Sequence, residues 1–182
     1  DTGDIVNFLD GALGGSTKHV FTVAVDASTG ARAWMMKADD TTYDIAAPLD
    51  DVVSVAVDAQ ASEGYRGGRM LRPLSASTST ASNSAVNTAG STAGSTNTGG
   101  GVAHLHVTIN TSTATTFKVQ HSTSGSTWAD LISFSTLVGG TAFQRSTVAG
   151  AVKEKLRSTI SALGTTGSVT AAVAFARQTA KT

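Results

Sequence analysis

Alternation of apolar and polar residues between Thr41 and Arg72 is the pattern that most limits what this chain can fold into. Val53, Val55 and Val57 fall on one parity, and polar residues such as Asp58 fall on the other. Side chains of a strand point alternately to two faces, so one parity is expected in a core and the other toward water or a partner. The segment is therefore predicted to be a β-hairpin.

The predicted connection of this hairpin is Ala46–Asp51. Tyr43 and Ile45 share one parity before it. Pro48 has no backbone N–H to donate to a sheet, so it fits a connection better than a strand. Nothing in the hairpin carries reactive chemistry, and it is interpreted as a building element.

The composition favours an all-β protein with a neutral surface. Hydrophobic residues make up 40% of the 182 residues, which is enough for a core, while charged residues make up only 14%. The usual charged share is about a quarter. The chain has no cysteine, so it can form neither a disulfide nor a thiolate metal site. Its apolar runs are short, and no membrane anchor and no signal peptide are expected.

Charge is unevenly divided along the neutral chain. Residues 1–74 contain 11 Asp and Glu against 6 Lys and Arg, whereas residues 75–182 contain 2 against 7. This asymmetry has two readings. One is solvated faces of no special role, and the other is complementarity between subunits or an acidic lining on one surface.

The first part of the chain predicts one helix and two further strands. Ile5, Phe8 and Leu9 belong to a helical pattern within 4–15, so a short helix is expected there. Strands are predicted over 18–26, with Phe21, Val23 and Val25 on one face, and over 31–38, with turns at Ser28–Gly30 and at Asp39–Asp40.

The second part predicts a run of strands separated by turns at roughly ten-residue spacing, which is typical of a β-sandwich. The expected strands are 102–109, 116–120, 128–134, 143–148 and 169–177. In the first of them, Ala103, Leu105, Val107 and Ile109 are expected inward, with Val102, His104, His106 and Thr108 outward.

Residues 151–163 fit two structures. Val152, Leu156, Ile160 and Leu163 fit a helix that Gly164 would end, but alternation around Leu156 and Ile160 also fits a strand. We favour the strand because the neighbouring segments are strands and β-branched residues lie in mid-segment.

Two segments are predicted to lack a strand. Residues 75–101 contain 13 Ser and Thr and 5 Gly without any charge, so they are interpreted as a linker, or as an arm that orders against a partner. Glu63–Gly68 is glycine-rich but lacks the phosphate-loop spacing, and it is interpreted as a mobile loop or bulge. The predicted domains are 1–74, a tube-like β domain, and 102–182, a β-sandwich-like module.

No active site is predicted, so the chain is not expected to be an enzyme or to hold a cofactor. His104 and His106 share a strand face and His121 lies further on, but a metal site would need more ligands than the nearby sequence offers. The carboxylate pairs at Asp39–Asp40 and Asp50–Asp51 are explained by turn chemistry. No G-x-S-x-G motif occurs.

Candidate contact residues for a neighbouring subunit come from two places. Arg66, Arg69 and Arg72 form a loose basic cluster beside Tyr65, without the aromatic pattern of a nucleic-acid site. Trp34, Met35 and Met36 are interpreted as core or subunit contact. The candidate interface residues are therefore Tyr65, Arg66, Arg69, Arg72, Trp34 and Met35.

The run YDIAAPLDDVVSVAVDAQ, residues 43–60, resembles the tail tube (major tail) proteins of long-tailed bacteriophages. The segments IVNFLDGALGG and GYRGGRML are similar to that family in order and spacing, and GGVAHLHVTI, KVQHSTSGSTWADLISF and VAFAR resemble its C-terminal β module. The likeness covers most of the chain. The family usually begins with further strands and a long loop before the helix, which this sequence lacks.

The resemblance implies a structural virion protein located in a phage tail. Such proteins form hexameric rings that stack into a tube with other tail proteins, and DNA passes through passively. It also implies an acidic lumen, for which the candidates here are Asp39, Asp40, Asp50, Asp51 and Asp58. The expected fold is mainly β: a sandwich- or barrel-like tube domain with one short helix, then a sandwich-like module. Alternatives are a capsid decoration protein and a carbohydrate-binding β-sandwich module.

Overall fold

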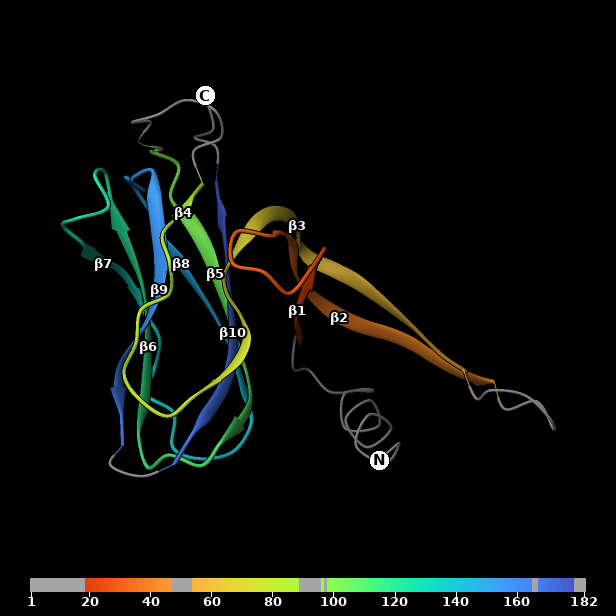
Figure 1. The fold of residues 1–182 in the computed structure, drawn as a ribbon. Helices are drawn as coiled ribbons and strands as arrows, with labels where there is room; N and C mark the ends of the chain where they lie inside the picture. The colour runs from red at the N-terminus through yellow and green to blue at the C-terminus, as the bar shows by residue number, and fades with distance from the viewer. Residues whose placement is uncertain (1–18, 47–53, 89–95, 97, 165–166, 179–182) are drawn as a thin grey trace. The chain divides into compact units, whose positions relative to one another are not determined.

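A computed structural model describes residues 19–46, 54–88, 96, 98–164 and 167–178, with side chains omitted for 39–46, 54–59 and 64. The described chain is all-β, as predicted, and Figure 1 shows its strands. The strands are β1 (His19–Ala24), β2 (Arg32–Ala46), β3 (Ser54–Ser77), β4 (Val86–Asn87), β5 (Gly101–Asn110), β6 (Thr115–Ser122), β7 (Ala129–Ser133), β8 (Ala142–Val148), β9 (Lys155–Leu163) and β10 (Val169–Arg177).

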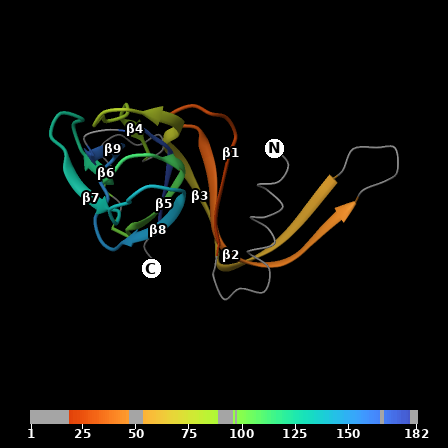
Figure 2. The ribbon, with the colours of Figure 1, turned by 90° about the horizontal axis from the view of Figure 1, so that it is seen from below.

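The strands form two sheets. One has six strands in the order β1-β2-β3-β10-β5-β8, and the other has four in the order β4-β9-β6-β7. Residues 22–35 and 66–182 make up one compact unit, and residues 1–21 and 36–65 make up another. The boundaries of these units differ from the division expected at 75–101. Within the larger unit, the strands of the two sheets lie around a common interior (Figure 2).

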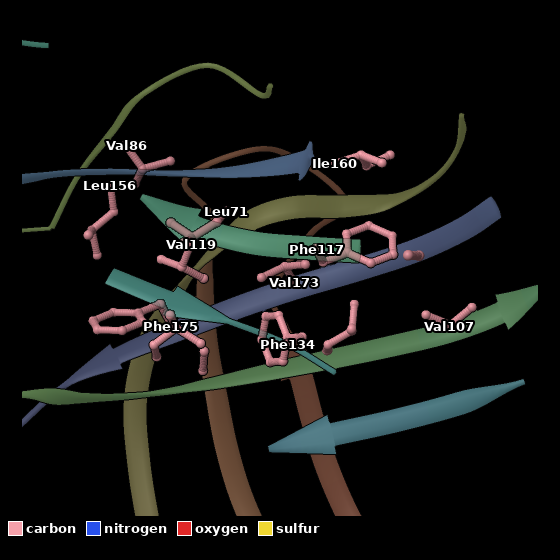
Figure 3. Packing of buried hydrophobic residues seen from close by; sticks show 14 of the residues in the cluster. Leu71, Val86, Val107, Phe117, Val119, Phe134, Leu156, Ile160, Val173 and Phe175 are labelled. Carbon is pink, nitrogen blue, oxygen red and sulfur yellow. The ribbon is translucent and has the colours of Figure 1, made fainter. Parts of the chain in front are cut away.

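The main core fills the space between the two sheets of the larger unit. Phe117 and Val119 from β6 meet Val173 and Phe175 from β10, as Figure 3 shows. All four side chains are at most 1% exposed. Each belongs to a strand with period-2 alternation, so the sequence pattern placed them on the same face correctly.

Strands β5 and β10 are buried on both faces. Ala103 and Leu105 face the main core, while Val102 packs with Ala174 and Ala176 in a second apolar cluster that also contains Met35 and Met70. The prediction that Val102 and His104 point outward was therefore wrong, because each is 1% exposed. A central strand has neighbours over both faces, which alternation alone does not reveal.

Three apolar residues of the predicted strands are exposed. Val23 and Val25, predicted to share a face with Phe21, are 59% and 61% exposed, and Ile109, predicted to face inward, is 53% exposed. No described side chain of β1 or β2 belongs to the main core cluster, so the four-stranded sheet does not cover Val23. Ile109 is exposed for another reason: a register shift between its partner Thr170 and the next residue, Ala171, places it on the opposite face from Val107. Alternation of apolar and polar residues identifies the two faces of a strand. Whether a face is buried depends on whether another sheet packs over it.

The predicted hairpin exists, with longer strands than expected. β2 and β3 are neighbours in the sheet, and their described bounds bracket the predicted connection, of which residues 47–51 lie outside the described residues. Asp39–Asp40 is not a turn, because β2 continues through it to Ala46. The predicted helix within 4–15 also lies outside the described residues.

The predicted loop Glu63–Gly68 is part of β3. A β-carbon on Gly68 would lie 2.4 Å from the carbonyl oxygen of Phe175, so glycine at this position lets β10 approach closely. Glycine inside a strand often marks such a close backbone approach rather than a loop. Packing against β10 therefore explains the glycine at position 68.

Part of the predicted linker lies against its own chain. The backbone N–H of Ile160 donates to Ala81 O (2.9 Å), and Asn83 N donates to Ser158 O (2.9 Å), both joining the segment to β9. Arg72 contributes Nη1 to Ser77 Oγ and Nη2 to Ala81 O, at 3.1 and 3.2 Å. These contacts hold residues 77–83 on the larger unit.

Residues 155–163 form strand β9, so the strand reading of the ambiguous segment is confirmed. Leu156, Ser158 and Ile160 are buried with the parity of a strand. Pairing with both β4 and β6 supplies the hydrogen bonds that decide between the two patterns.

We expect Gly68→Ala to destabilise the fold by about 1–3 kcal/mol, the usual cost of forcing atoms into a packed site. The matched control is Gly67→Ala, since a β-carbon at Gly67 meets nothing within 4 Å. Urea unfolding midpoints measure both. Equal midpoints for the two variants would contradict the close approach of β3 and β10.

Candidate functional site

A cleft lined by three arginines lies at one end of the larger unit. Arg32 of β2, Arg69 of β3 and Arg177 of β10 line a cavity of about 230 Å³. A neighbouring cavity of about 530 Å³ shares Arg32 and Arg69 and is also lined by Trp34 and Asp26. We call these two connected hollows the arginine cleft.

The fold positions the arginines by continuing the core face of two strands. Arg69 lies two residues from the buried Leu71, and Arg177 lies two residues beyond the buried Phe175. Residues two apart in a strand share a face. Phe175 is the register partner of Arg69, so the basic residues gather where the hydrophobic core ends.

The backbone around the cleft is held by a turn. Gly30, with φ of 91°, adopts a conformation that favours glycine. Its N–H donates to Met70 O (2.7 Å), and Met70 N donates to Ala31 O (2.9 Å). Arg69 Nη1 donates to Gly30 O (3.2 Å), which fixes one guanidinium at the junction of the two hollows.

The other two guanidiniums differ in how firmly they are held. Arg177 Nε donates to Thr88 Oγ1 (2.8 Å), and its Nη2 donates to Lys153 O. Burial lowers the pKa of Arg177, and the nearby Glu154 carboxylate opposes this. The exposed Arg32 side chain has neither a hydrogen bond nor an ion pair with any described residue.

One carboxylate also lines the cleft. Asp26 accepts hydrogen bonds from Ser28 N (2.8 Å) and from the Ser28 hydroxyl, which lower the pKa of its carboxyl group. The cleft therefore combines two guanidiniums held by hydrogen bonds, the exposed Arg32 guanidinium, one carboxylate and one indole. These groups bind oxyanions and polar rings.

The predicted interface residues do not all come together. Trp34 and Arg69 line the arginine cleft. Tyr65 is 63% exposed and Arg66 is half-buried, while Met35 and Arg72 are buried at 1% and 3%. Their role in a subunit contact stays a prediction.

Sequence reasoning missed Arg32, Arg177 and Asp26. The available signal was a basic residue at the end of each of two apolar strands, in ARAWM and VAFAR. Nothing in the sequence shows that these two strand ends meet, because β3 lies between them in the sheet.

Two of the five predicted lumen residues lie outside the described part of the chain, and the other three lie on β2 and β3. Asp50 and Asp51 lie outside the described residues, and Asp39, Asp40 and Asp58 belong to strands whose side chains are not described at those positions.

The histidines are joined through a hydroxyl. Thr22 Oγ1 lies 3.1 Å from His104 Nδ1 and 2.9 Å from His106 Nε2, linking β1 to β5. His121 lies on β6 in the other sheet, where Lys153 N donates to its Nδ1 at 3.4 Å. The described part of the chain contains no cluster of three or more His, Cys, Asp or Glu that could hold a metal ion.

A third hollow lies on the opposite face of the six-stranded sheet from the main core. Its volume is about 490 Å³, and Ala24, Met70, Leu74 and Ala174 give it a mainly apolar lining. Leu74 is 55% exposed. An apolar hollow of this kind suits contact with another surface.

Fold and cleft define an all-β, sandwich-like protein with a cleft lined by arginines and one tryptophan. Comparisons with protein-family models, with curated proteins and with solved structures found no match. Among the residues that the structure describes, no helix is long and apolar enough to cross a membrane.

We expect the free energy of unfolding to fall as the pH drops below 6.5. Burial lowers the pKa of His106 and of His121 from the ordinary value of 6.5, so the unfolded chain binds protons that the folded chain excludes. The stability is fully present above pH 6.5 and is lost as pH falls toward the lowered values. Chemical denaturation between pH 8 and pH 5 measures the slope.

The control for this slope is the double variant His106→Gln with His121→Gln, which removes both titrating groups. Its slope over the same range should be shallower than that of the wild type. Asp130 does not contribute to the slope between pH 8 and pH 5. Its ordinary pKa of 3.8 lies below this range, and hydrogen bonds from Lys118 and Gln120 lower the pKa further in the folded state. An unchanged slope would show that other groups carry the pH dependence.

Proposed function

We propose that this protein is a structural virion protein, a subunit of a phage tail tube that assembles into stacked hexameric rings forming a channel for genome delivery. The sequence likeness of residues 43–60 to tail tube proteins carries the proposal. The all-β fold is compatible with it. Its mechanism is assembly, and its partners are copies of itself and other tail proteins.

The open edges of the sheets support assembly. The six-stranded sheet ends at β1 and at β8, and neither end is paired further within the described chain. Val23 on β1 is 59% exposed and Phe143 on β8 is 39% exposed. Soluble proteins usually protect such edges with charge or proline, and an unprotected edge can pair with another chain. Head-to-tail pairing of β1 with β8 would produce rings if the rotation closes.

The apolar hollow on the outer face of the six-stranded sheet adds a second contact surface. Leu74, which lines the hollow, is 55% exposed, and Ile109 at the end of β5 is another exposed apolar side chain, at 53%. Burying them against a neighbour would stabilise assembly by roughly 25 cal/mol for each Å² of apolar area removed from water. The same residues in a permanent monomer would remain exposed to solvent.

The acidic first half of the sequence supports the proposed channel role. Residues 1–74 carry 11 acidic residues against 6 basic ones. A wall of like charge repels DNA phosphates, so DNA would pass through without binding. Asp39, Asp40, Asp50, Asp51 and Asp58 remain the proposed lining residues.

Two alternative functions can be distinguished from a tail tube subunit. A capsid decoration protein would keep the sandwich without forming a ring. A carbohydrate-binding module needs an accessible aromatic side chain, and Trp34, which the sequence analysis interpreted as core or subunit contact, lines an open cavity. Trp128 is less available, since the Arg157 guanidinium stacks 4.3 Å from its ring centre.

Electron microscopy of the purified protein tests the assembly. We expect rings of near six-fold symmetry or tubes for the wild type, and their loss in Val23→Lys, because a lysine on an edge strand opposes pairing. The matched control is Val138→Lys, which changes a 76% exposed valine outside the named strands. Persistent monomers of the wild type would contradict the proposal.

Neutralising Asp39, Asp40, Asp50 and Asp51 to asparagine tests the channel charge. We expect tubes to form normally and DNA ejection from particles carrying the variant to slow, because the repulsion between wall and phosphates is reduced. Ejection kinetics followed by a DNA-binding dye give the rate. Unchanged kinetics with intact tubes would show that these residues do not act through lumen charge.

A further inference from the structure

We propose that the arginine cleft binds an acidic saccharide, meaning a sugar unit that carries a carboxylate or a phosphate. The site lies beside the β1 edge, since Val25 and Asp26 follow β1 and line it, but its ligand binding does not depend on ring formation. It draws on Arg32, Arg69, Arg177, Trp34 and Asp26, which come from β2, β3, β10 and the turn region before Gly30.

The smaller hollow suits the anionic group. Three guanidiniums line a cavity of about 230 Å³ that no described carboxylate lines. Guanidinium groups bind carboxylates and phosphates through paired N–H donors. Arg177 is partly buried, so its attraction for an anion is screened less by water than that of a surface cation.

Space and preorganisation favour a ligand over a purely structural role. Arg177 and Arg69 are already held by Thr88, Lys153 and Gly30, so little side-chain freedom would be lost on binding. Arg32 keeps its donors available among the described residues. Gly67, which also lines the hollow, has no atom within 4 Å of the place where a side chain would begin.

The larger hollow suits the sugar ring. Trp34 offers an apolar, electron-rich ring face, which can pack against the C–H bonds of a pyranose. Asp26 supplies hydrogen-bond acceptors for hydroxyl groups, and Arg32 and Arg69 supply donors at the boundary with the smaller hollow. A saccharide needs both kinds of partner because each hydroxyl donates and accepts.

The same features disfavour nucleic acid. A nucleic-acid strand stacks successive bases on several aromatic side chains along a continuous basic groove. This cleft has one tryptophan, and the Asp26 carboxylate within it would repel a phosphate backbone. The formal net charge of the chain is zero, so the protein as a whole has no net charge with which to attract a polyanion.

Isothermal titration with defined probes tests the proposal. The probes are a trimer of galacturonic acid, glucose 6-phosphate, a neutral galactose trimer and a thymidine hexanucleotide. We expect the charged sugars to bind at least about tenfold more tightly than the neutral trimer, as expected for hydrogen bonds to charged groups. Preference between the first two probes identifies the anionic group as carboxylate or phosphate.

Three variants connect binding to the cleft. Arg32→Gln should weaken binding of the charged sugar about tenfold, since it removes an exposed guanidinium with no described partner to disturb. Trp34→Ala should weaken binding of charged and neutral sugars alike. Arg157→Gln is the matched control, because it removes the other arginine near a tryptophan and lies on β9.

Circular dichroism and thermal melting confirm that each variant is folded before titration. The proposal is overturned if charged and neutral trimers bind equally, if Arg32→Gln and Arg157→Gln have the same effect, or if the hexanucleotide binds more tightly than either charged sugar. Because titration does not require tubes, a protein that binds sugar without forming rings would contradict the assembly proposal and leave this one standing.

Discussion

Burial of alternate side chains between the two sheets is the interaction on which the rest of this structure depends. Phe117 and Phe175 reach the same interior from opposite sheets, and both are at most 1% exposed. Where this core ends on β3 and β10, the same strand faces carry Arg69 and Arg177 in place of apolar residues. The cleft is thus a product of the core, since the strands that bury the aromatics also aim the guanidiniums. The same two strands, β3 and β10, therefore carry both the apolar core residues and the arginines of the cleft.

The polar segment after β3 adds a second kind of support. Residues of low hydrophobicity cannot bury much area, yet Val86 is 7% exposed and belongs to the main core. Around it, backbone bonds to β9 and the buried Arg72 supply the remaining contacts. Asn87 Nδ2 donates to the buried Glu154 carboxylate at 2.8 Å, and Thr88 bonds both Glu154 O and Arg177. The cleft is therefore walled partly by a segment whose composition suggested disorder.

Sequence patterns predicted the fold class and most strands, because period-2 alternation follows directly from strand geometry. They failed where burial depends on a distant neighbour. Val102 and His104 were placed outward because nothing local shows that β5 is covered on both faces. The exposure of Val23 was not predicted either, because nothing local shows that β1 lies beyond the opposing sheet. The candidate cleft was not predicted, although two of its residues, Trp34 and Arg69, were predicted as subunit contacts. Its remaining members come from strand ends that only the sheet order brings together.

The position of β10 has a consequence for how the chain reaches this structure. The last described strand lies between β3 and β5, at the centre of the six-stranded sheet rather than at its margin. Until it is inserted, β3 and β5 have no common neighbour, and the interior has no Val173 or Phe175. Pairings between residues so far apart in sequence form slowly, since a long loop must close first. During synthesis on a ribosome, the place of β10 between β3 and β5 therefore stays empty while the earlier strands are made. The six-stranded sheet can form only after nearly all of the described chain has emerged.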